Sequence, residues 1–412
     1  MADYNIKDNF NKTKEVIGKK FGEVMGSENN VVIISFVIIF FILFSVLSWI
    51  YNTLSNKSRS CIRINSIYKE DNDLRTDTPA LPIKINEDNK LKILVKNFYI
   101  KTAYNCCCVD GYKNNWVDAC ALRKCIYQGA RCLDFEIYSY NDEPIIAAST
   151  ANNNSIKETY NYMKFQDVLT IIKNENHSNK IANHVDPLFL HFRIMSDNIN
   201  IYKKMAILIK SVLFNNNDQN QNICRIKEEK LVMSNINELQ NRYIIMVNAK
   251  NYVNVQQTDL IDYVNLQSGG PNLGLLRYQT LLAAGDNNAL LKAQTKRSLF
   301  IVLPDLNNNI ENYDWIKAYN NGCQFIAMKF QNVDNQLIHY NKIMFIENIN
   351  NINGEALRAI ILKPPNLIES DQNDPEYEKI YELGGNTKVD ASFCKILGKG
   401  FDDTTKQCIK IK

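Results

Sequence analysis

From residue 91 onward, short apolar runs rich in β-branched and aromatic residues alternate with longer amphipathic stretches. The runs read LKILV, RCLDFEIY, DPLFLHF, NRYIIMV, SLFIVLP, CQFIAMKF and ALRAIILKP. Segments of helical length separate them, and this alternation is typical of parallel strands joined by helical crossovers. Seven or eight such units are enough to close a parallel sheet on itself. We therefore predict an α/β fold, a (β/α)8 barrel of the TIM type, over residues 89–366.

Two polar stretches interrupt this pattern. Residues 215–222, NNNDQNQN, are predicted to be a surface insertion of low complexity. Residues 248–271 are predicted to be a weakly ordered connection. Residues 367–412 follow the last apolar run and are expected to form a C-terminal tail.

A second feature precedes the barrel. Residues 31–51, VVIISFVIIFFILFSVLSWIY, contain no charged side chain. At about 1.5 Å of rise per residue, a helix of this length crosses a hydrocarbon layer of about 30 Å. A cleaved signal peptide is the competing interpretation, but the run is longer than a signal core and no small-x-small cleavage site follows it. We predict a single-pass transmembrane helix whose partner is the lipid bilayer.

The segments beside this helix are polar. Residues 1–30 place Phe10, Ile17, Phe21 and Val24 at helical spacing, which fits either an amphipathic helix on the lipid surface or an ordinary solvated tail. Residues 52–88 are predicted to be a stalk. Basic residues lie close to both ends of the apolar run, and their slight excess after it favours a cytoplasmic barrel.

The amino-acid composition limits the classes of partner that we expect for this chain. The chain has 48 basic and 44 acidic residues, a net charge of +4, so it lacks the strongly basic character of a nucleic-acid-binding domain. Asn, Ile and Lys are abundant, as in proteins from the AT-rich genomes of many large DNA viruses and some protists. One expectation is therefore a membrane protein of a virus particle or of an internal membrane of its host. The sequence does not specify the protein partner.

The cysteines do not form a recognisable framework. There are eleven, and no C-x-x-C pair suggests structural zinc. Cys132 and Cys323 lie in strand-like runs, where a reduced cysteine packs as a small hydrophobe. The tail pair, Cys394 and Cys408, either closes a short loop in an oxidising space or stays reduced. The remaining cysteines are Cys61, Cys106, Cys107, Cys108, Cys120, Cys125 and Cys224.

Residues 127–150, YQGARCLDFEIYSYNDEPIIAAST, have the layout of a phosphodiesterase active-site strand. They resemble the second strand of the phosphoinositide-specific phospholipase C barrel, whose pattern is G-x-R-x-x-E-L-D followed by P-I-[IV]-x-H-G-H. Ala148 and Thr150 stand at the two histidine positions of that pattern. The residues that fall into register are Gly129, Arg131, Asp134, Glu136, Pro144, Ile145 and Ile146.

The resemblance extends over roughly residues 91–364. NYDWIKAYNNGCQFIAMKFQ, residues 312–331, resembles N-Y-x-P-x-x-x-W-N-x-G-C-Q-x-V-A-L-N-F-Q without a gap. FYIKTAYN, DPLFLHFRI and ILKPP resemble three further strands of the same family. The resemblance implies a PLC-like phosphodiesterase barrel split into a first block (89–247), a junction (248–271) and a second block (272–366). The identities in the second block are Asn312, Tyr313, Asn320, Gly322, Cys323, Gln324, Ala327, Phe330 and Gln331.

In that family two histidines assist phosphodiester cleavage, one of them as general acid and base. By the resemblance, their positions hold Tyr104 and Ala148. Neither residue shuttles a proton near neutral pH, because a phenol titrates near about 10 and a methyl group does not titrate. The chain is therefore expected to be a pseudoenzyme.

The family also binds calcium with an asparagine and three carboxylates. By the resemblance, these positions hold Asn105, Asp134, Glu136 and Arg193. Because an arginine repels calcium, we expect the metal to be lost. Arg193 is then expected to bind the carboxylates of Asp134 and Glu136 as their counter-charge. A residual metal site at Asp134 and Glu136 is the alternative.

Lysines, an arginine and a tyrosine grip the inositol phosphates in that family. By the resemblance, Met246 and Asn248 stand at the lysines, Ile301 at the arginine and Leu303 at the tyrosine. These side chains argue against recognition of a phosphorylated headgroup at the old site.

Other residues carry side chains that are capable of chemistry. His191 lies two residues before Arg193 and faces the same way. It is either a displaced general acid and base or a hydrogen-bonded core residue. The run from Cys106 to Cys108 lacks a neighbour that would activate a thiol. Tyr313 is assigned to packing.

We therefore expect a membrane-anchored, catalytically inactive phospholipase C-like protein that acts as a binding or structural component. The competing hypothesis is an active phosphoric diester hydrolase with a site rebuilt around Asp134, Glu136 and His191.

Overall fold

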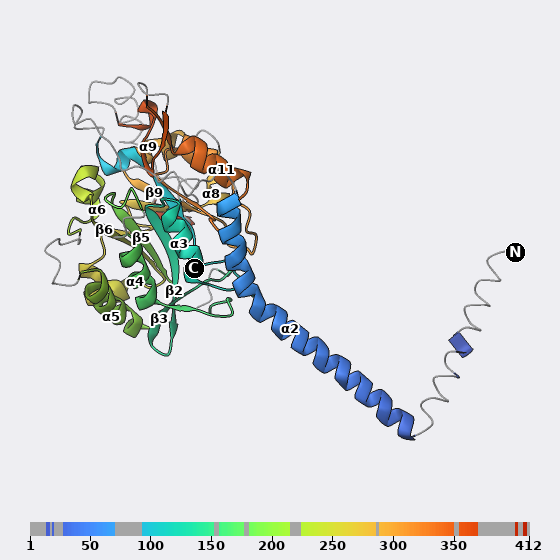
Figure 1. The fold of residues 1–412 in the computed structure, drawn as a ribbon. Coiled ribbons are helices and arrows are strands. Elements are labelled where there is room, and N and C mark those ends of the chain that lie inside the picture. The colour runs from blue at the N-terminus through green and yellow to red at the C-terminus, as the bar shows by residue number, and fades with distance from the viewer. Residues whose placement is uncertain are drawn as a thin grey trace. The chain divides into compact units, whose positions relative to one another are not determined.

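The computed structural model describes residues 14–16, 19, 28–70, 93–151, 156–176, 181–214, 224–285, 288–349, 354–369, 400–402 and 407–409. By internal packing the chain divides into two units, Met1–Arg59 and Ser60–Lys412. The second unit contains the barrel (Figure 1).

Eight parallel strands form the barrel, and most are buried on both faces, as continuous apolar runs require. Seven neighbouring pairs lie side by side in parallel register, and β1 pairs with both β2 and β10. The remaining gap, between β7 and β8, is spanned by one parallel bridge from Ser268 to Leu273. The predicted α/β barrel is thus confirmed. In order around the ring the strands are β1 (Phe98–Ala103), β2 (Cys132–Tyr140), β5 (Leu188–Ile194), β6 (Tyr243–Ala249), β7 (Leu266–Gln267), β8 (Leu273–Arg277), β9 (Leu299–Leu303) and β10 (Phe325–Met328).

Helices pack alongside the strands (Figure 1). In α4 the buried residues Phe165, Val168, Leu169 and Ile172 recur at the spacing of one helical face, so that face turns toward the barrel. The α-helices after β1 are α3 (Ala119–Tyr127), α4 (Phe165–Asn176), α5 (Ile199–Leu208), α6 (Glu228–Val232), α7 (Tyr252–Gln256), α8 (Tyr278–Ala283), α9 (Ala289–Thr295), α10 (Ile316–Asn320) and α11 (Asn335–His339). Shorter helical segments are η2 (Val95–Asn97), η3 (Ile209–Leu213), η4 (Ile236–Leu239), η5 (Asp259–Asp262), η6 (Tyr340–Met344) and η7 (Pro365–Leu367).

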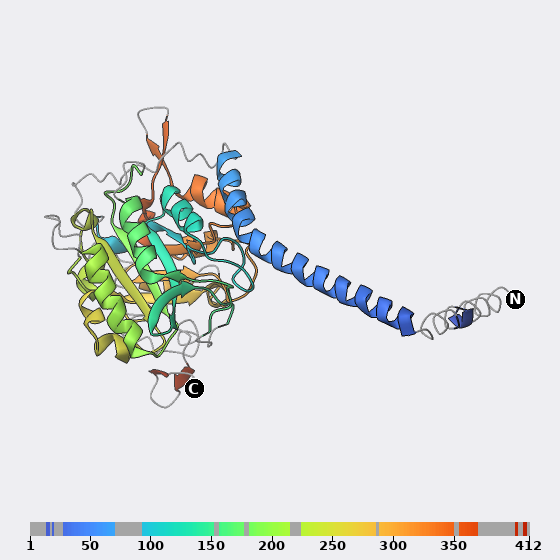
Figure 2. The same cartoon turned by 60° about the horizontal axis from the view of Figure 1, so that its bottom comes forward.

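The second unit also contains short antiparallel strands. β3 (Glu143–Ala147) folds back on β2 and also pairs with β4 (Met163–Lys164). β11 (Ile346–Ile349) and β12 (Gly354–Leu357) form a hairpin that projects from the barrel (Figure 2). β14 (Gly400–Asp402) and β15 (Gln407–Ile409) form a second hairpin.

The strand assignments need three corrections. The LKILV run was expected to form a strand, but its last residue, Val95, is the first residue of the short helix η2. The first strand of the barrel is β1. The last run contributes β13 (Ile360–Leu362), which pairs antiparallel with β1 instead of joining the parallel ring. Residues 248–271, predicted to be weakly ordered, contain α7, η5 and the barrel strand β7.

One long helix, α2 (Glu28–Glu70), runs through the boundary between the two units. Its apolar part has exposed side chains and is long and apolar enough to cross a membrane, judged by length and composition. Residues 52–70, expected to belong to a stalk, are helical, and Ile64 and Tyr68 are buried in the second unit. Residues 71–88, most of residues 1–30 and Cys394 lie outside the described residues.

Candidate functional site

The candidate site lies where β1, β2 and β5 run side by side. Asp134 on β2 is paired in register with His191 on β5, and Glu136 is paired with Arg193. Residues two apart on a strand point to the same face, so all four side chains share one face of the sheet. Asn105, two residues beyond the end of β1, joins them, and its left-handed backbone (φ 43°) turns the chain at this point.

Arg193 lies between the two carboxylates, as the sequence predicted. Its Nε donates to Oδ1 of Asp134 at 2.8 Å and its Nη2 donates to Oδ2 at 2.7 Å. Its Nη1 donates to Oε1 of Glu136 at 2.7 Å. Nη2 also donates to Oδ1 of Asn105 at 2.8 Å. The planar guanidinium therefore binds both acids and the amide oxygen through charge-assisted hydrogen bonds.

The remaining hydrogen bonds come from neighbouring groups. Asp134 accepts the backbone N–H of Asn105 at 3.1 Å, and Nδ1 of His191 lies 2.7 Å from its Oδ1. Glu136 accepts Nδ2 of Asn105 at 3.3 Å and the hydroxyl of Tyr138 at 2.7 Å. It also accepts the backbone N–H of Ser149 at 2.9 Å. Each of the four carboxylate oxygens thus accepts two hydrogen bonds.

Burial strengthens these interactions. Asp134 and Glu136 have 0% and 1% of their surface exposed, and Arg193 has 2%. Burial alone would raise the pKa of Asp134, but Arg193 and His191 hold it below its usual range. Burial alone would lower the pKa of Arg193, but Asp134 and Glu136 hold it well above its usual range. The Arg193–Asp134 pair therefore stays charged.

These residues do not fit a calcium ion. Calcium takes about six to eight oxygen ligands at roughly 2.3–2.6 Å. The oxygens of Asp134 and Glu136 already carry hydrogen bonds, and Oδ1 of Asn105 accepts from Arg193. A guanidinium occupies the centre of the group, where it would repel a divalent cation.

The positions matched to the catalytic histidines are also buried. Tyr104 is 2% exposed, and its ring lies 4.8 Å from the guanidinium carbon of Arg193 in a cation–π contact. Ala148 is 0% exposed. Ser149 and Thr150, the two residues after Ala148, both donate to Glu158. Glu158 accepts the backbone N–H of Thr150 at 2.7 Å and the hydroxyl of Ser149 at 3.1 Å. Hydrogen bonds from Thr150 and Ser149, with Lys113, lower the pKa of Glu158 to about 2.

His191 is fully buried, with its Nδ1 on Asp134. Its Nε2 has no hydrogen-bond partner among the described residues. Burial lowers the pKa of His191, although the hydrogen bond with Asp134 opposes this. The imidazole is therefore neutral in the folded protein at neutral pH and donates its Nδ1 proton to Asp134.

This burial predicts a pH dependence. The unfolded histidine takes up a proton below about pH 6.5, whereas folded His191 resists it, so stability should fall as pH drops below that value. The expected slope from this residue is at most about 1.4 kcal/mol per pH unit. In His191→Gln, whose amide still donates to Asp134 but does not titrate, the slope between pH 7 and pH 5 should be shallower by this amount. Equal slopes in denaturant titrations of the two proteins would contradict the assignment.

The positions matched to phosphate-gripping residues hold no cation. Met246, Ile301 and Leu303 are buried on β6 and β9. Asn248 donates its Nδ2 to the carbonyl of Ser268 at 3.0 Å, beside the bridge that joins β7 to β8. Their contacts are therefore structural.

Other sequence candidates also occupy structural places. Cys106, Cys107 and Cys108 are buried, and burial raises the pKa of each thiol, so none is an activated nucleophile. The hydroxyl of Tyr313 donates to the carbonyl of Val302 at 3.2 Å, which agrees with a packing role.

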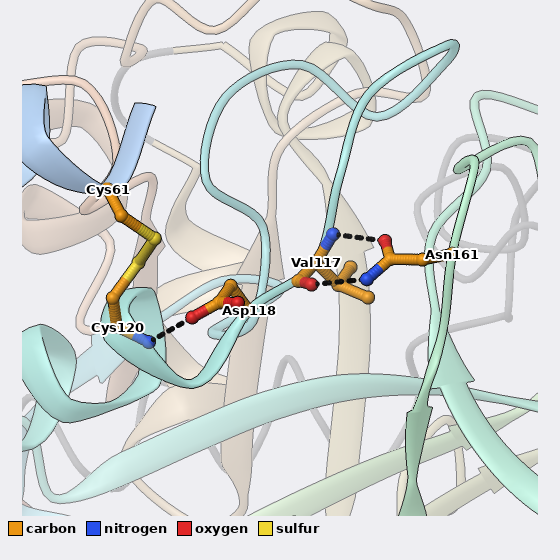
Figure 3. The surroundings of a disulfide bond; sticks show 5 residues. All are labelled: Cys61, Val117, Asp118, Cys120 and Asn161. Carbon is orange, nitrogen blue, oxygen red and sulfur yellow. Dashed lines mark hydrogen bonds between the residues drawn. A yellow bond between two sulfur atoms is a disulfide. The ribbon is translucent and has the colours of Figure 1, made fainter. Parts of the chain in front are cut away.

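Two features escaped sequence reasoning. Arg277, at the end of β8, donates to the carbonyl of Pro304 at 2.7 Å and approaches the hydroxyl of Tyr104 at 3.4 Å. Cys61 and Cys120 form a disulfide between α2 and α3 (Figure 3). The two cysteines are 59 residues apart and belong to no spaced motif, so the sequence held no signal for their pairing.

Comparison with known proteins identifies the fold of this chain. No family model and no curated protein matches the sequence. The crystal structures of PLC21 from S. officinalis and from L. pealei match with TM-scores of 0.54 and 0.52, at 16% and 17% sequence identity. Each match covers 71% of this chain but only 39% of the other. At this identity the likeness shows the fold alone, that of a PLC-like phosphodiesterase barrel.

Proposed function

We propose that this chain, which has the PLC-like phosphodiesterase fold, is a membrane-anchored pseudoenzyme whose barrel serves as a binding or structural component. The anchor is the apolar part of α2 over residues 31–51. The proposal concerns the barrel and its helix alone, since the matched structures are much longer proteins.

One observation carries the loss of activity. The guanidinium of Arg193 fills the space between Asp134 and Glu136 and satisfies both acids. In the family that the sequence resembles, a carboxylate stands at this position and calcium binds between the acids. An internal cation that is covalently part of the fold takes the place of an exchangeable one, so it neutralises the acids without activating a substrate hydroxyl.

The proton-transfer positions support the same conclusion. Burial raises the pKa of Tyr104, so its phenol stays protonated near neutral pH. Ala148 has no group that transfers a proton. A phosphodiesterase needs a base for the attacking hydroxyl and an acid for the leaving group, and these two positions supply neither.

The alternative is an active hydrolase that uses His191 with Asp134 and Glu136. His191 and Asp134 have the hydrogen bond of a catalytic pair. However, both are completely buried, and Asp134 is held by Arg193. A general base must reach the hydroxyl from which it removes a proton, and a buried imidazole does not.

Turnover measurements distinguish the two functions. The full-length protein, purified in detergent or nanodiscs, is incubated with inositol lipids and with glycerophosphodiesters, with calcium or with a chelator. We expect product release no faster than with heat-denatured protein, while a calcium-dependent phospholipase C assayed alongside turns over the same substrates. Turnover by the native chain that disappears in His191→Gln would establish the alternative.

The proposed setting follows from the helix and the composition. We propose a single-pass protein of a virus particle or of an internal membrane of its host, which binds a protein partner through the barrel. Purified particles or membranes that lack the chain after alkaline carbonate washing would contradict the anchoring.

A further inference from the structure

The disulfide joins the folded end of α2 to the start of α3. The Cα atoms of Cys61 and Cys120 are 5.9 Å apart, within the range that a disulfide spans. Figure 3 shows Cys120 beside Asp118, which caps α3 by accepting the backbone N–H of Cys120 at 2.9 Å. Asn161 holds the preceding residue, Val117, through both of its backbone groups. The Cys120 side is therefore fixed by local hydrogen bonds.

The Cys61 side is fixed by packing. We call residues 60–68 of α2 the strap. Ile64 and Tyr68 in the strap are buried against Val109 and Ala121. The hydroxyl of Tyr68 donates to the carbonyl of Phe330 at 2.7 Å. Arg63 pairs with Asp110 at 3.3 Å. These contacts bring Cys61 to Cys120, so the pairing follows from the fold.

The two cysteines differ from the other thiols. The free cysteines at positions 106, 107, 108, 125, 132, 224 and 323 are buried, and burial raises the pKa of six of them. Cys61 and Cys120 are partly exposed. Cys120 also lies in the first turn of α3, where the helix dipole stabilises a thiolate. Thiol exchange from solvent therefore reaches this pair more readily than those seven thiols.

We propose that the strap is locked to the barrel by oxidation, and that the barrel lies on the oxidising side of its membrane. The inference rests on the proposed anchoring by residues 31–51. The two thiols lose two protons and two electrons to the disulfide of a thiol oxidoreductase, which leaves as a dithiol. A reducing compartment keeps such partly exposed pairs open, so a formed disulfide places the barrel outside it. Residues 1–30 then lie on the reducing side.

The flanking charges do not oppose this orientation. Within twenty residues of the apolar run there are four basic residues before it and four after it. The four before it are Lys12, Lys14, Lys19 and Lys20, and the four after it are Lys57, Arg59, Arg63 and Lys69. Because Arg63 is held by Asp110, it is part of the barrel's own charge balance. The count over this window is even. The disulfide therefore carries the inference, against the cytoplasmic barrel that the nearest residues, Lys19 and Lys20 before the run and Lys57, Arg59 and Arg63 after it, favoured.

Protease protection tests the orientation. The full chain is made in the presence of sealed microsomes, with one tag at each end. We expect external protease to remove the N-terminal tag and to spare the barrel and its C-terminal tag until detergent opens the vesicles. Loss of the C-terminal tag in sealed vesicles would overturn the inference. Release of the chain by alkaline carbonate would instead contradict the membrane anchor and the proposed function.

Thiol trapping tests the lock in the same sample. Free thiols are blocked under denaturing conditions, the protein is then reduced, and newly released thiols are labelled with a mass tag. We expect the wild type to gain two more tags than Cys61→Ser/Cys120→Ser. The control Cys224→Ser, which removes a buried free thiol, should gain as many tags as the wild type. Equal tagging of the wild type and the double variant would show that the pair is reduced, and would refute the lock.

Discussion

Replacing Arg193 with alanine should lower the free energy of unfolding by roughly 3 to 5 kcal/mol, because two buried carboxylates lose their counter-charge. At about 2 to 4 °C per kcal/mol in large domains, the melting temperature should fall by roughly 6 to 20 °C. The cause is the position of the guanidinium, which donates to Asp134, Glu136 and Asn105 in a site with almost no exposed surface. Differential scanning fluorimetry of the full chain in detergent measures the shift.

Two matched variants make this result specific. Arg123 pairs with Glu175 at 2.9 Å, but 46% of its side chain is exposed, so Arg123→Ala should cost less than about 1 kcal/mol. Arg193→Lys keeps the charge but loses the two-pronged hydrogen bonding of the guanidinium. Its loss of unfolding free energy should therefore lie between those of Arg193→Ala and Arg123→Ala. If Arg193→Ala melts at the temperature of Arg123→Ala, the guanidinium does not hold the site together.

The second large effect is expected from the disulfide. The bond closes a loop across 59 residues, and removing it should cost about 4 kcal/mol on the chain-entropy account. Cys61→Ser, Cys120→Ser and the double variant should lose the same amount, since each removes the same bond. Chemical unfolding of the three variants checks this equality. A double variant as stable as the wild type would mean that the packing of Ile64 and Tyr68 fixes the strap by itself.

The fold was predictable where strands are long and apolar. β2, β5 and β6 stand out in the sequence because both of their faces are covered, by the barrel interior and by helices. β7 is only two residues long and leaves no periodic signal. β8 contains Gly274, where a Cβ would lie 2.4 Å from a ring carbon of Phe300, so close packing there replaces the usual apolar residue.

The site was predictable as far as strand geometry reaches. Asp134, Glu136 and Arg193 were expected to meet, because alternate residues on neighbouring strands share a face. The backbone donor of Ser149 was not foreseen, since it depends on how β3 folds back on β2. The donor from Tyr138 lies on the same strand as Glu136 and was also not foreseen. Arg277 reaches Tyr104 only because β8 closes the ring, and no local pattern encodes that contact.

In the function proposed above, an arginine takes the place of a calcium ion. Arg193→Glu supplies a useful comparison, because it restores a carboxylate at the position that ligates calcium in the resembled family. Three buried acids repel one another, so this variant should be strongly destabilised in chelator, and calcium should raise its melting temperature. Asn105→Ala in the same background should weaken that response.

The most direct measurement is the melting temperature of the wild-type chain in chelator and in millimolar calcium. We expect no difference between the two conditions, because the oxygens of Asp134 and Glu136 are already bound by Arg193 and its neighbours. A saturable rise in the wild-type melting temperature with calcium that Asn105→Ala abolishes would show that a metal binds where the arginine was placed.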